Sequence, residues 1–237
     1  MNKATLTIFI SICLSLVGAI STRAQQTPAP GTDAALYYDK AVKGNAEAQF
    51  NLAICYYEGT GVDKNYTEAY AWMLKAAQQG HARAQCNLGA FLGKGTGCTQ
   101  DYVEAAKWYR LAAEQGNAYA QQNLAFFYHS GQGVTRDYAE AARLYRLAAE
   151  QGLVNSQYNT AINYLNGHGV TEDHAEAARW FRMAAEQGDP DSQYLLAELY
   201  ENGDGVTRDL DEAAKWYRLA AEQGDTDAKA ALERLGR

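Results

Sequence analysis

The pentapeptide "AAEQG" occurs four times in the chain, at residues 112–116, 148–152, 184–188 and 220–224. Successive copies are 36 residues apart, and "AAQQG" at 76–80 continues the same spacing. A constant interval of this length is typical of repeat proteins, in which each interval is one supersecondary unit. Five units therefore align without a gap, at 45–80, 81–116, 117–152, 153–188 and 189–224.

The first half of each unit predicts an amphipathic helix. In "NAYAQQNLAFFYHS" (117–130), apolar residues recur three or four positions apart. A Gly-x-Gly follows, here Gly131 and Gly133. The first glycine suits the left-handed residue that ends a helix, and the second lets the chain reverse. Because no strand and no fuller glycine pattern accompany them, these glycines do not predict a nucleotide-binding loop.

The second half of each unit predicts another helix, for example "DYAEAARLYRLAAEQ" (137–151). Asp137 occupies the N-cap position, and Glu140 three residues later makes the start resemble a capping box. Recurrence of these carboxylates at every helix start favours capping over catalysis. "AAEQG" is then the last turn of this helix, where the alanines allow close helix approach and the glycine turns the chain. The predicted N-caps are Asn65, Asp101, Asp137, Asp173 and Asp209.

A single helix pair cannot bury both of its apolar faces, so the units must stack on one another. The sequence predicts an all-α fold, an α/α solenoid (superhelix) of five 36-residue helix-pair repeats over residues 33–237. A half-repeat helix is expected at each end. Residues 33–44 are expected to form a lone second helix and residues 225–237 a lone first helix, closing the exposed faces of the stack.

The N-terminus has a different composition. Lys3 precedes an apolar run over 6–20, and a stretch of small residues then ends in "STRA". This pattern predicts a secretory signal peptide at 1–24, with an uncleaved anchor as the alternative. Residues 25–32, "QQTPAPGT", are expected to be a Pro-rich spacer. The prediction is an exported protein, periplasmic or secreted. No other apolar run approaches the length of a membrane span, so no membrane insertion is expected after signal removal.

Charge and cysteine content narrow the possible partners. The formal net charge of −7 becomes −9 when Lys3 and Arg23 leave with the signal peptide. An acidic chain is a poor ligand for nucleic acid or anionic membranes.

Three cysteines remain after signal removal: Cys55, Cys86 and Cys98. Because their number is odd, at least one must be free or pair between chains. The sequence leaves open whether Cys55 and Cys86 form a disulfide or pack as small apolar side chains.

Signatures of catalysis and metal binding are missing from the sequence. No serine begins a Ser-x-x-Lys motif and no Cys-x-x-Cys occurs. His168 and His174 are the only histidines close in sequence, and their spacing is not typical of a zinc site. We therefore expect no enzyme activity, no metal and no cofactor. The regularly recurring Trp72, Trp108, Trp180 and Trp216 indicate core packing, and the basic residues that follow the capping glutamates indicate a solvated mixed-charge face.

The run "LAFFYHSGQGVTRDYAEAARLYRLAAEQG" (124–152) and its near copies resemble the Sel1-like repeat family of tetratricopeptide-like α-solenoids. Small departures include Cys98 in place of the loop valine and Thr160 in place of a leucine. The resemblance implies a non-enzymatic adaptor that holds proteins together, as exported bacterial members do in envelope signalling, envelope assembly or host encounters. A structural component of envelope assembly is an alternative, as is a hydrolase of the β-lactam-related type, for which the serine motif is missing.

The first helix of each unit has two faces that differ in how much their residues vary. Unit positions are numbered from the residue that follows each closing glycine, so position 1 is residue 45, 81, 117, 153 or 189. Positions 4, 5, 8, 9 and 12 hardly vary and predict the packing face. Positions 3, 6, 10, 13 and 14 vary, yet many are apolar or aromatic. First helices line the concave surface of helix-pair solenoids, so this stripe predicts a groove for a protein or peptide partner. Packing against the next unit is the alternative for each candidate: Phe50, Ile54, Tyr57, Tyr119, Phe126, Tyr158, Ile162 and Tyr194.

An asparagine recurs at unit position 7, at the edge of the variable stripe. Its amide could hydrogen-bond the backbone of an extended peptide. Alternatively, it bonds the adjacent helix or its own loop, because a half-buried amide needs partners. The candidates are Asn51, Asn87, Asn123 and Asn159.

Overall fold

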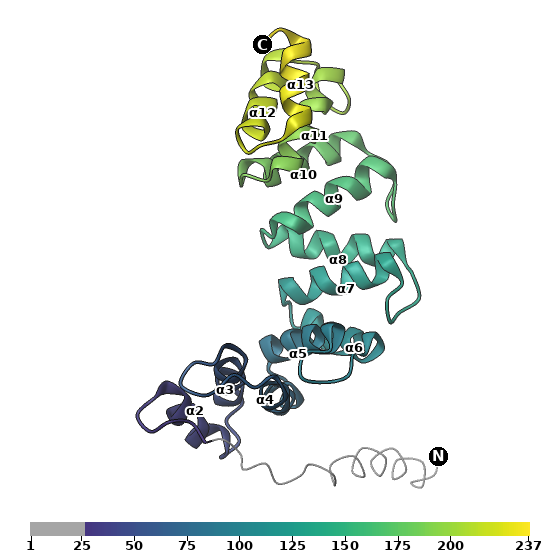
Figure 1. Cartoon of the computed structure of the whole chain (residues 1–237). Coiled ribbons are helices and arrows are strands. Elements are labelled where there is room, and N and C mark those ends of the chain that lie inside the picture. Colours follow the sequence, from purple (N-terminus) through teal and green to yellow (C-terminus); the bar gives the residue numbers. More distant parts are fainter. Residues whose placement is uncertain (1–26) are drawn as a thin grey trace, which may run out of the picture.

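The structure is a computed structural model that describes residues 27–237. The predicted signal peptide (1–24) and the start of the spacer lie outside the described residues. Within 27–237 the chain forms twelve helices and no strand, arranged as consecutive pairs in a curved stack (Figure 1). The helices are α2 (Asp33–Ala41), α3 (Ala46–Glu58), α4 (Tyr66–Gln78), α5 (Ala82–Lys94), α6 (Tyr102–Glu114), α7 (Ala118–Ser130), α8 (Tyr138–Glu150), α9 (Val154–Asn166), α10 (His174–Glu186), α11 (Pro190–Asn202), α12 (Leu210–Glu222) and α13 (Thr226–Leu235).

Each helix packs on its neighbours in chain order, so the fold is one continuous array. The pairs α3 and α4, α5 and α6, α7 and α8, α9 and α10, and α11 and α12 are the five repeats. The single helices α2 and α13 cover the two ends (Figure 1). The predicted all-α solenoid of five helix-pair repeats is confirmed.

Helix ends follow the residues that the sequence analysis selected. Gly131 ends α7 in the left-handed conformation, with φ of 74°. Asp137 caps α8 by accepting the Glu140 N–H at 3.0 Å. The second hydrogen bond of a capping box, from the Asp137 N–H to the Glu140 carboxylate, does not form. The Asp137 N–H donates to the Tyr128 carbonyl at 3.0 Å, so the resemblance to a capping box is only partial. The Glu140 carboxylate instead accepts hydrogen bonds from the Arg143 guanidinium at 2.7 and 2.8 Å on the solvated face.

The second glycine of each loop is a contact between repeats. Gly133 has φ of 66°, and a Cβ atom there would lie 2.2 Å from the carbonyl oxygen of Tyr102, the first residue of α6. Gly97, Gly169 and Gly205 approach the preceding repeat in the same way. The loop of one repeat therefore rests on the start of the second helix of the repeat before it, and only glycine permits that approach.

The glutamine of "AAEQG" has a role that the sequence analysis missed. Gln115 donates from Nε2 to Oε1 of buried Gln85 at 2.6 Å, and Gln85 donates to the Ala77 carbonyl at 3.2 Å. Each repeat therefore has its two helices joined to each other and to the end of the preceding repeat. The pairs are Gln49 with Gln79, Gln85 with Gln115, Gln121 with Gln151, Gln157 with Gln187, and Gln193 with Gln223.

The apolar core divides between the third and fourth repeats. One buried cluster extends from Ala34 to Tyr145, and a second begins at Ala149. Thr160 and Asn163 of α9 occupy the positions that Leu124 and Phe127 hold in α7. Two polar side chains thus replace two large apolar ones at this boundary. Elsewhere the predicted packing holds, with Trp72, Trp180 and Trp216 buried and Trp108 half-buried.

Cys55, Cys86 and Cys98 are free thiols, and the first two are buried among apolar side chains. Burial raises the pKa of Cys86 to about 11, so the thiol stays protonated and unreactive. The packing alternative for Cys55 and Cys86 therefore holds in this structure. Between residues 27 and 237, no helix has the length and apolarity needed to cross a bilayer.

Candidate partner-binding face

The variable face consists of unit positions 3, 6, 7, 10, 13 and 14 on the first helices α3, α5, α7, α9 and α11. On this face a hollow of about 420 Å³, the central hollow, lies between α7, α9 and the start of α11. It brings together the candidates Asn123, Phe126, Tyr158 and Asn159. The lining residues are Gln122, Asn123, Phe126, Tyr145, Asn155, Tyr158, Asn159, Asp189 and Asp191.

Large aromatic side chains on this face are open to solvent. Phe126 is 49% exposed and Tyr119, two turns earlier on α7, is 63% exposed. The Phe126 ring meets the buried Phe127 ring edge-on, at 6.4 Å between centroids. An exposed phenylalanine on a folded helix retains apolar surface that a partner could bury.

The C-terminal edge of the central hollow is acidic. Tyr158 is half-buried, and its ring stands edge-on against Phe181 at 5.9 Å. Burial, and after it the carboxylates of Asp191 and Asp189, raise the pKa of Tyr158, so its hydroxyl stays protonated and can donate. Asp189 also caps α11 by accepting the Ser192 N–H at 2.8 Å. The hollow therefore pairs aromatic surface with negative charge.

The four asparagines differ in their contacts, and among the described residues none bonds the adjacent helix or its own loop. Asn51 donates to Glu47 Oε1 at 3.4 Å and Asn159 to the Asn155 carbonyl at 2.6 Å, both within their own helix. The side chains of Asn87 and Asn123 make no hydrogen bond to any residue in 27–237. Asn87 lines a second hollow, and Asn123 lines the central hollow.

The hollow beside Asn87, the N-terminal hollow, has a volume of about 200 Å³ and lies between α3 and α5. Tyr57, which is 41% exposed, stacks on Phe91 there at 5.5 Å between centroids. Ile54 is half-buried on the same wall. The lining residues are Ile54, Tyr57, Asn87, Ala90, Phe91, Lys94 and Thr96.

Phe50 does not belong to the exposed surface. Only 3% of it is exposed, because it stacks on the His81 imidazole at 4.9 Å while the Arg83 guanidinium lies 4.6 Å from its ring centroid. His81 is fixed in turn, with Nδ1 accepting the Ala84 N–H at 3.1 Å and Nε2 bonded to Glu47 at 2.8 Å. Phe50 therefore packs between the first two repeats, which was the alternative for this residue.

The remaining candidates are half-buried. Ile162 packs against the second core cluster. Tyr194 contacts the Tyr217 ring at 5.6 Å and donates its hydroxyl to Glu198 at 2.9 Å. Both side chains support the fold, and neither lines the two hollows.

Sequence reasoning missed the polar half of the central hollow. Gln122, Asn155 and Asp191 occupy variable-face positions 6, 3 and 3 of their units. They were missed because only apolar and aromatic residues were selected at those positions. Asp189, at the cap of α11, could have been found by following the same face into the next repeat.

The two histidines that are close in sequence have different partners. His174 hydrogen-bonds Asp204 at 2.6 Å, and the His168 ring stacks on the Tyr138 ring at 5.6 Å between centroids. No group of His, Cys, Asp and Glu in the described part of the chain could hold a metal ion.

Comparison with known proteins gives five matches to a family model described as Sel1 repeat, at residues 46–81, 82–117, 118–153, 154–189 and 190–225. A Sel1 repeat protein from Oxalobacter formigenes is 38% identical, with a TM-score of 0.73 over 87% of this chain and 81% of that one. Another solved structure is c5321, a protective antigen present in uropathogenic Escherichia coli strains displaying an SLR fold. It is 39% identical, with a TM-score of 0.82 over 87% of this chain. The match spans 45% of the length of c5321. No curated protein matches the chain.

Proposed function

Because this chain belongs to the Sel1 repeat family, we propose that it is a non-enzymatic scaffold that binds a protein partner on its variable face. Proteins of this repeat class generally mediate protein–protein interaction. The single observation that carries the proposal is the surroundings of Phe126. A half-exposed phenylalanine beside an unpaired asparagine, Asn123, lines a hollow on the face of the first helices. Aromatic anchors in such surroundings carry much of the binding energy in protein interfaces.

The chemistry of the central hollow indicates what it binds. An apolar side chain of an extended peptide would cover Phe126 and Tyr158. The Asn123 amide would bond that peptide's backbone, as a group with one donor end and one acceptor end can. A lysine or arginine further along would meet Asp189 and Asp191, which supply specificity and faster association. The N-terminal hollow repeats the arrangement with Tyr57 and Asn87, so a longer segment could occupy both.

The second helices give little support to the enzymatic alternative. The recurring carboxylates Asp101, Asp137, Asp173 and Asp209 are engaged as helix caps. The glutamates that follow them bond lysine or arginine side chains on the exposed side of the second helices. These groups are accounted for by the fold, which supports a scaffold in place of a hydrolase.

We place this function outside the cytoplasm. The support is the basic residue, apolar run and small-residue stretch of the first 24 residues, which precede the helical array. Mass determination of the N-terminus of the protein recovered from its native cell tests this. A mature chain beginning at Gln25 is expected, and an intact N-terminus in the membrane fraction would indicate the anchor instead.

The binding proposal is tested by selection from a random peptide display library on the chain from residue 25. We expect enriched peptides with an apolar residue followed by a basic one. Phe126→Asp and Asn123→Ala should each lose this enrichment while circular dichroism stays unchanged, because both side chains are at the surface. Leu111→Asp is the matched control, since Leu111 is 43% exposed on α6, away from the variable face. Equal selection by Phe126→Asp and the parent chain would reject this face as the binding site.

A further inference from the structure

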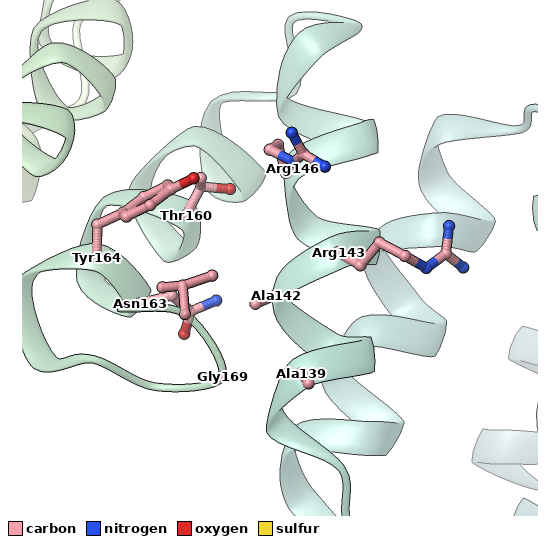
Figure 2. Close-up of a pocket in the computed structure, with 9 residues that line it drawn as sticks. Ala139, Ala142, Arg143, Arg146, Thr160, Asn163, Tyr164 and Gly169 are labelled. Atoms are coloured by element: carbon pink, nitrogen blue, oxygen red, sulfur yellow. The ribbon is translucent and has the colours of Figure 1, made fainter. Parts of the chain in front are cut away.

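A separate pocket of about 300 Å³ lies between α8 of the third repeat and α9 of the fourth (Figure 2). It shares no residue with the two hollows of the variable face. Its floor is where the apolar core is interrupted. The lining residues are Ala139, Ala142, Arg143, Arg146, Thr160, Asn163, Tyr164, Gly169 and Val170.

Two polar residues of α9 line the floor of the pocket. Thr160 and Asn163 stand where α7 has Leu124 and Phe127, and both polar side chains are smaller than the apolar ones that they replace. Thr160 is 2% exposed and Asn163 is 3% exposed, so neither is a surface residue. Loss of apolar volume in a core costs stability, and the other repeats retain a leucine at the Thr160 position. A fold that tolerates this loss at one interface has room there for a ligand.

The polar atoms of the pocket are only partly satisfied. The Thr160 hydroxyl donates to the Ser156 carbonyl at 2.7 Å. Asn163 Nδ2 is buried and has no hydrogen-bond partner in the described part of the chain. Figure 2 shows this side chain on the side of α9 that faces α8. Leaving a buried N–H donor unpaired costs free energy, which an acceptor in the pocket would recover.

The positive charge at the pocket is also free. In the second and fourth repeats, Arg110 and Arg182 donate to the hydroxyls of Tyr128 and Tyr200 in the next repeat. The equivalent pair here is Arg146 and Tyr164, on opposite sides of the pocket (Figure 2), and these two make no such bond. Arg143, by contrast, is paired with Glu140. The Arg146 guanidinium and Tyr164 hydroxyl are therefore both open to a ligand.

We propose that this pocket binds a carboxylate group, held by the Asn163 amide N–H at its floor and by Arg146 at its mouth. The free groups include the Asn163 N–H donor, the Tyr164 hydroxyl and the Arg146 cation, which match the two acceptor oxygens and the negative charge of a carboxylate. The volume is at the lower end of ligand pockets and suits a small organic acid or one acidic side chain of a peptide. The site is independent of the variable face, so either proposal can fail alone.

The test is nuclear magnetic resonance of the Asn163 side-chain amide in the chain from residue 25. Probes are acetate, N-acetylglutamate and a capped peptide with a single glutamate, with the glutamine peptide as its neutral control. A saturable shift of the Asn163 side-chain resonance with acetate or N-acetylglutamate identifies a small-molecule site. A saturable shift with the glutamate peptide alone identifies a peptide site. We expect Arg146→Gln to weaken binding roughly tenfold, as loss of a charge-assisted hydrogen bond does.

A second variant separates binding from folding. Thr160→Leu with Asn163→Phe restores the side chains of the third repeat and fills the pocket, so it should fold at least as well as the parent and lose carboxylate binding altogether. Its binding is followed by calorimetry, because the Asn163 probe is gone. The proposal is rejected if no acid probe gives a saturable shift of the Asn163 resonance, or if the glutamine peptide gives the same shift as the glutamate peptide. It is also rejected if Arg146→Gln binds as tightly as the parent chain, and this result does not depend on the double variant being folded.

Discussion

Gln151 at the end of α8 donates from Nε2 to Oε1 of Gln121 in α7, at 2.8 Å. Gln121 is 5% exposed and donates its own Nε2–H to the Ala113 carbonyl of the preceding repeat at 3.4 Å. The buried amide thus bridges two helices of one repeat and the last turn of another. This chain of bonds explains why glutamine, and no other polar residue, is retained in every "AAEQG" and "AAQQG".

Gln121→Leu should therefore destabilise the solenoid by about 1–3 kcal/mol, because the buried Ala113 carbonyl loses one of its two hydrogen bonds and the part-buried bond from Gln151 is lost. Urea unfolding followed by circular dichroism measures the change. Gln78→Leu is the matched control, since Gln78 is exposed on the last turn of α4 and belongs to no such pair. Equal stabilities of the two variants would show that the glutamine bridge contributes nothing net.

Gly133→Ala separates backbone conformation from close approach. Gly116 and Gly133 both have positive φ, at 84° and 66°, so alanine at either position incurs the left-handed penalty of about 1–2 kcal/mol. Only at Gly133 would the new Cβ meet another repeat, 2.2 Å from the Tyr102 carbonyl oxygen, whereas nothing lies within 4 Å at Gly116. We expect Gly133→Ala to lower the melting temperature clearly more than Gly116→Ala. Similar losses would contradict the packing role of the second loop glycine.

The sequence was sufficient for the fold because each structural demand recurs in every unit. Helix caps such as Asp137, loop glycines such as Gly131 and the alanines of the last turn can be identified by comparing the repeats with one another. The bridging role of Gln121 could not be identified in this way, because its invariance does not say which partner it meets. That partner, Gln151, is 30 residues away and becomes adjacent only when the two helices pack.

The candidate site was less predictable, since exposure on the variable face depends on the neighbouring repeat. Phe50 and Phe126 stand at positions 6 and 10 of their units and looked equivalent in sequence. His81 and Arg83 of the next repeat cover Phe50, whereas Phe126 stays half-exposed. The pocket beside Asn163 shows the same limit. Thr160 was visible as a departure from leucine, but the space that it leaves depends on how α8 and α9 pack.

Filling that space should stabilise the chain. Thr160→Leu with Asn163→Phe adds apolar contacts at the boundary of the two core clusters and removes the unpaired Asn163 donor, so we expect a gain of roughly 1–3 kcal/mol. Differential scanning calorimetry in the absence of carboxylate buffers gives the change. The reciprocal change, Leu124→Thr in the third repeat, should destabilise by about 2–4 kcal/mol. A double variant no more stable than the parent would mean that the pocket is already filled on average or cannot accept the larger side chains.

The C-terminal helix should be sensitive to acid through Glu201. The Arg234 guanidinium of α13 donates to both carboxylate oxygens of Glu201 in α11, one at 2.9 Å, and the Tyr217 hydroxyl donates at 2.9 Å. These hydrogen bonds, the one from Arg234 foremost, lower the pKa of Glu201 below its usual value of about 4.3. The unfolded chain therefore binds this proton more readily than the folded chain. The stabilisation is complete above the unfolded pKa and is lost as pH falls through the folded pKa.

Glu201→Gln should remove that part of the acid sensitivity. The parent chain should show faster amide hydrogen exchange in α13 as pH falls from 5 toward 3, after correction for the intrinsic pH dependence of exchange, and the variant should show a flatter response from a lower starting protection. Glu198→Gln, on the same helix but bonded to Tyr194 and not to Arg234, is the control and should retain the acid response. A parent chain in which α13 is protected equally at both ends of this range would show that the Arg234 contact does not hold the helix in place.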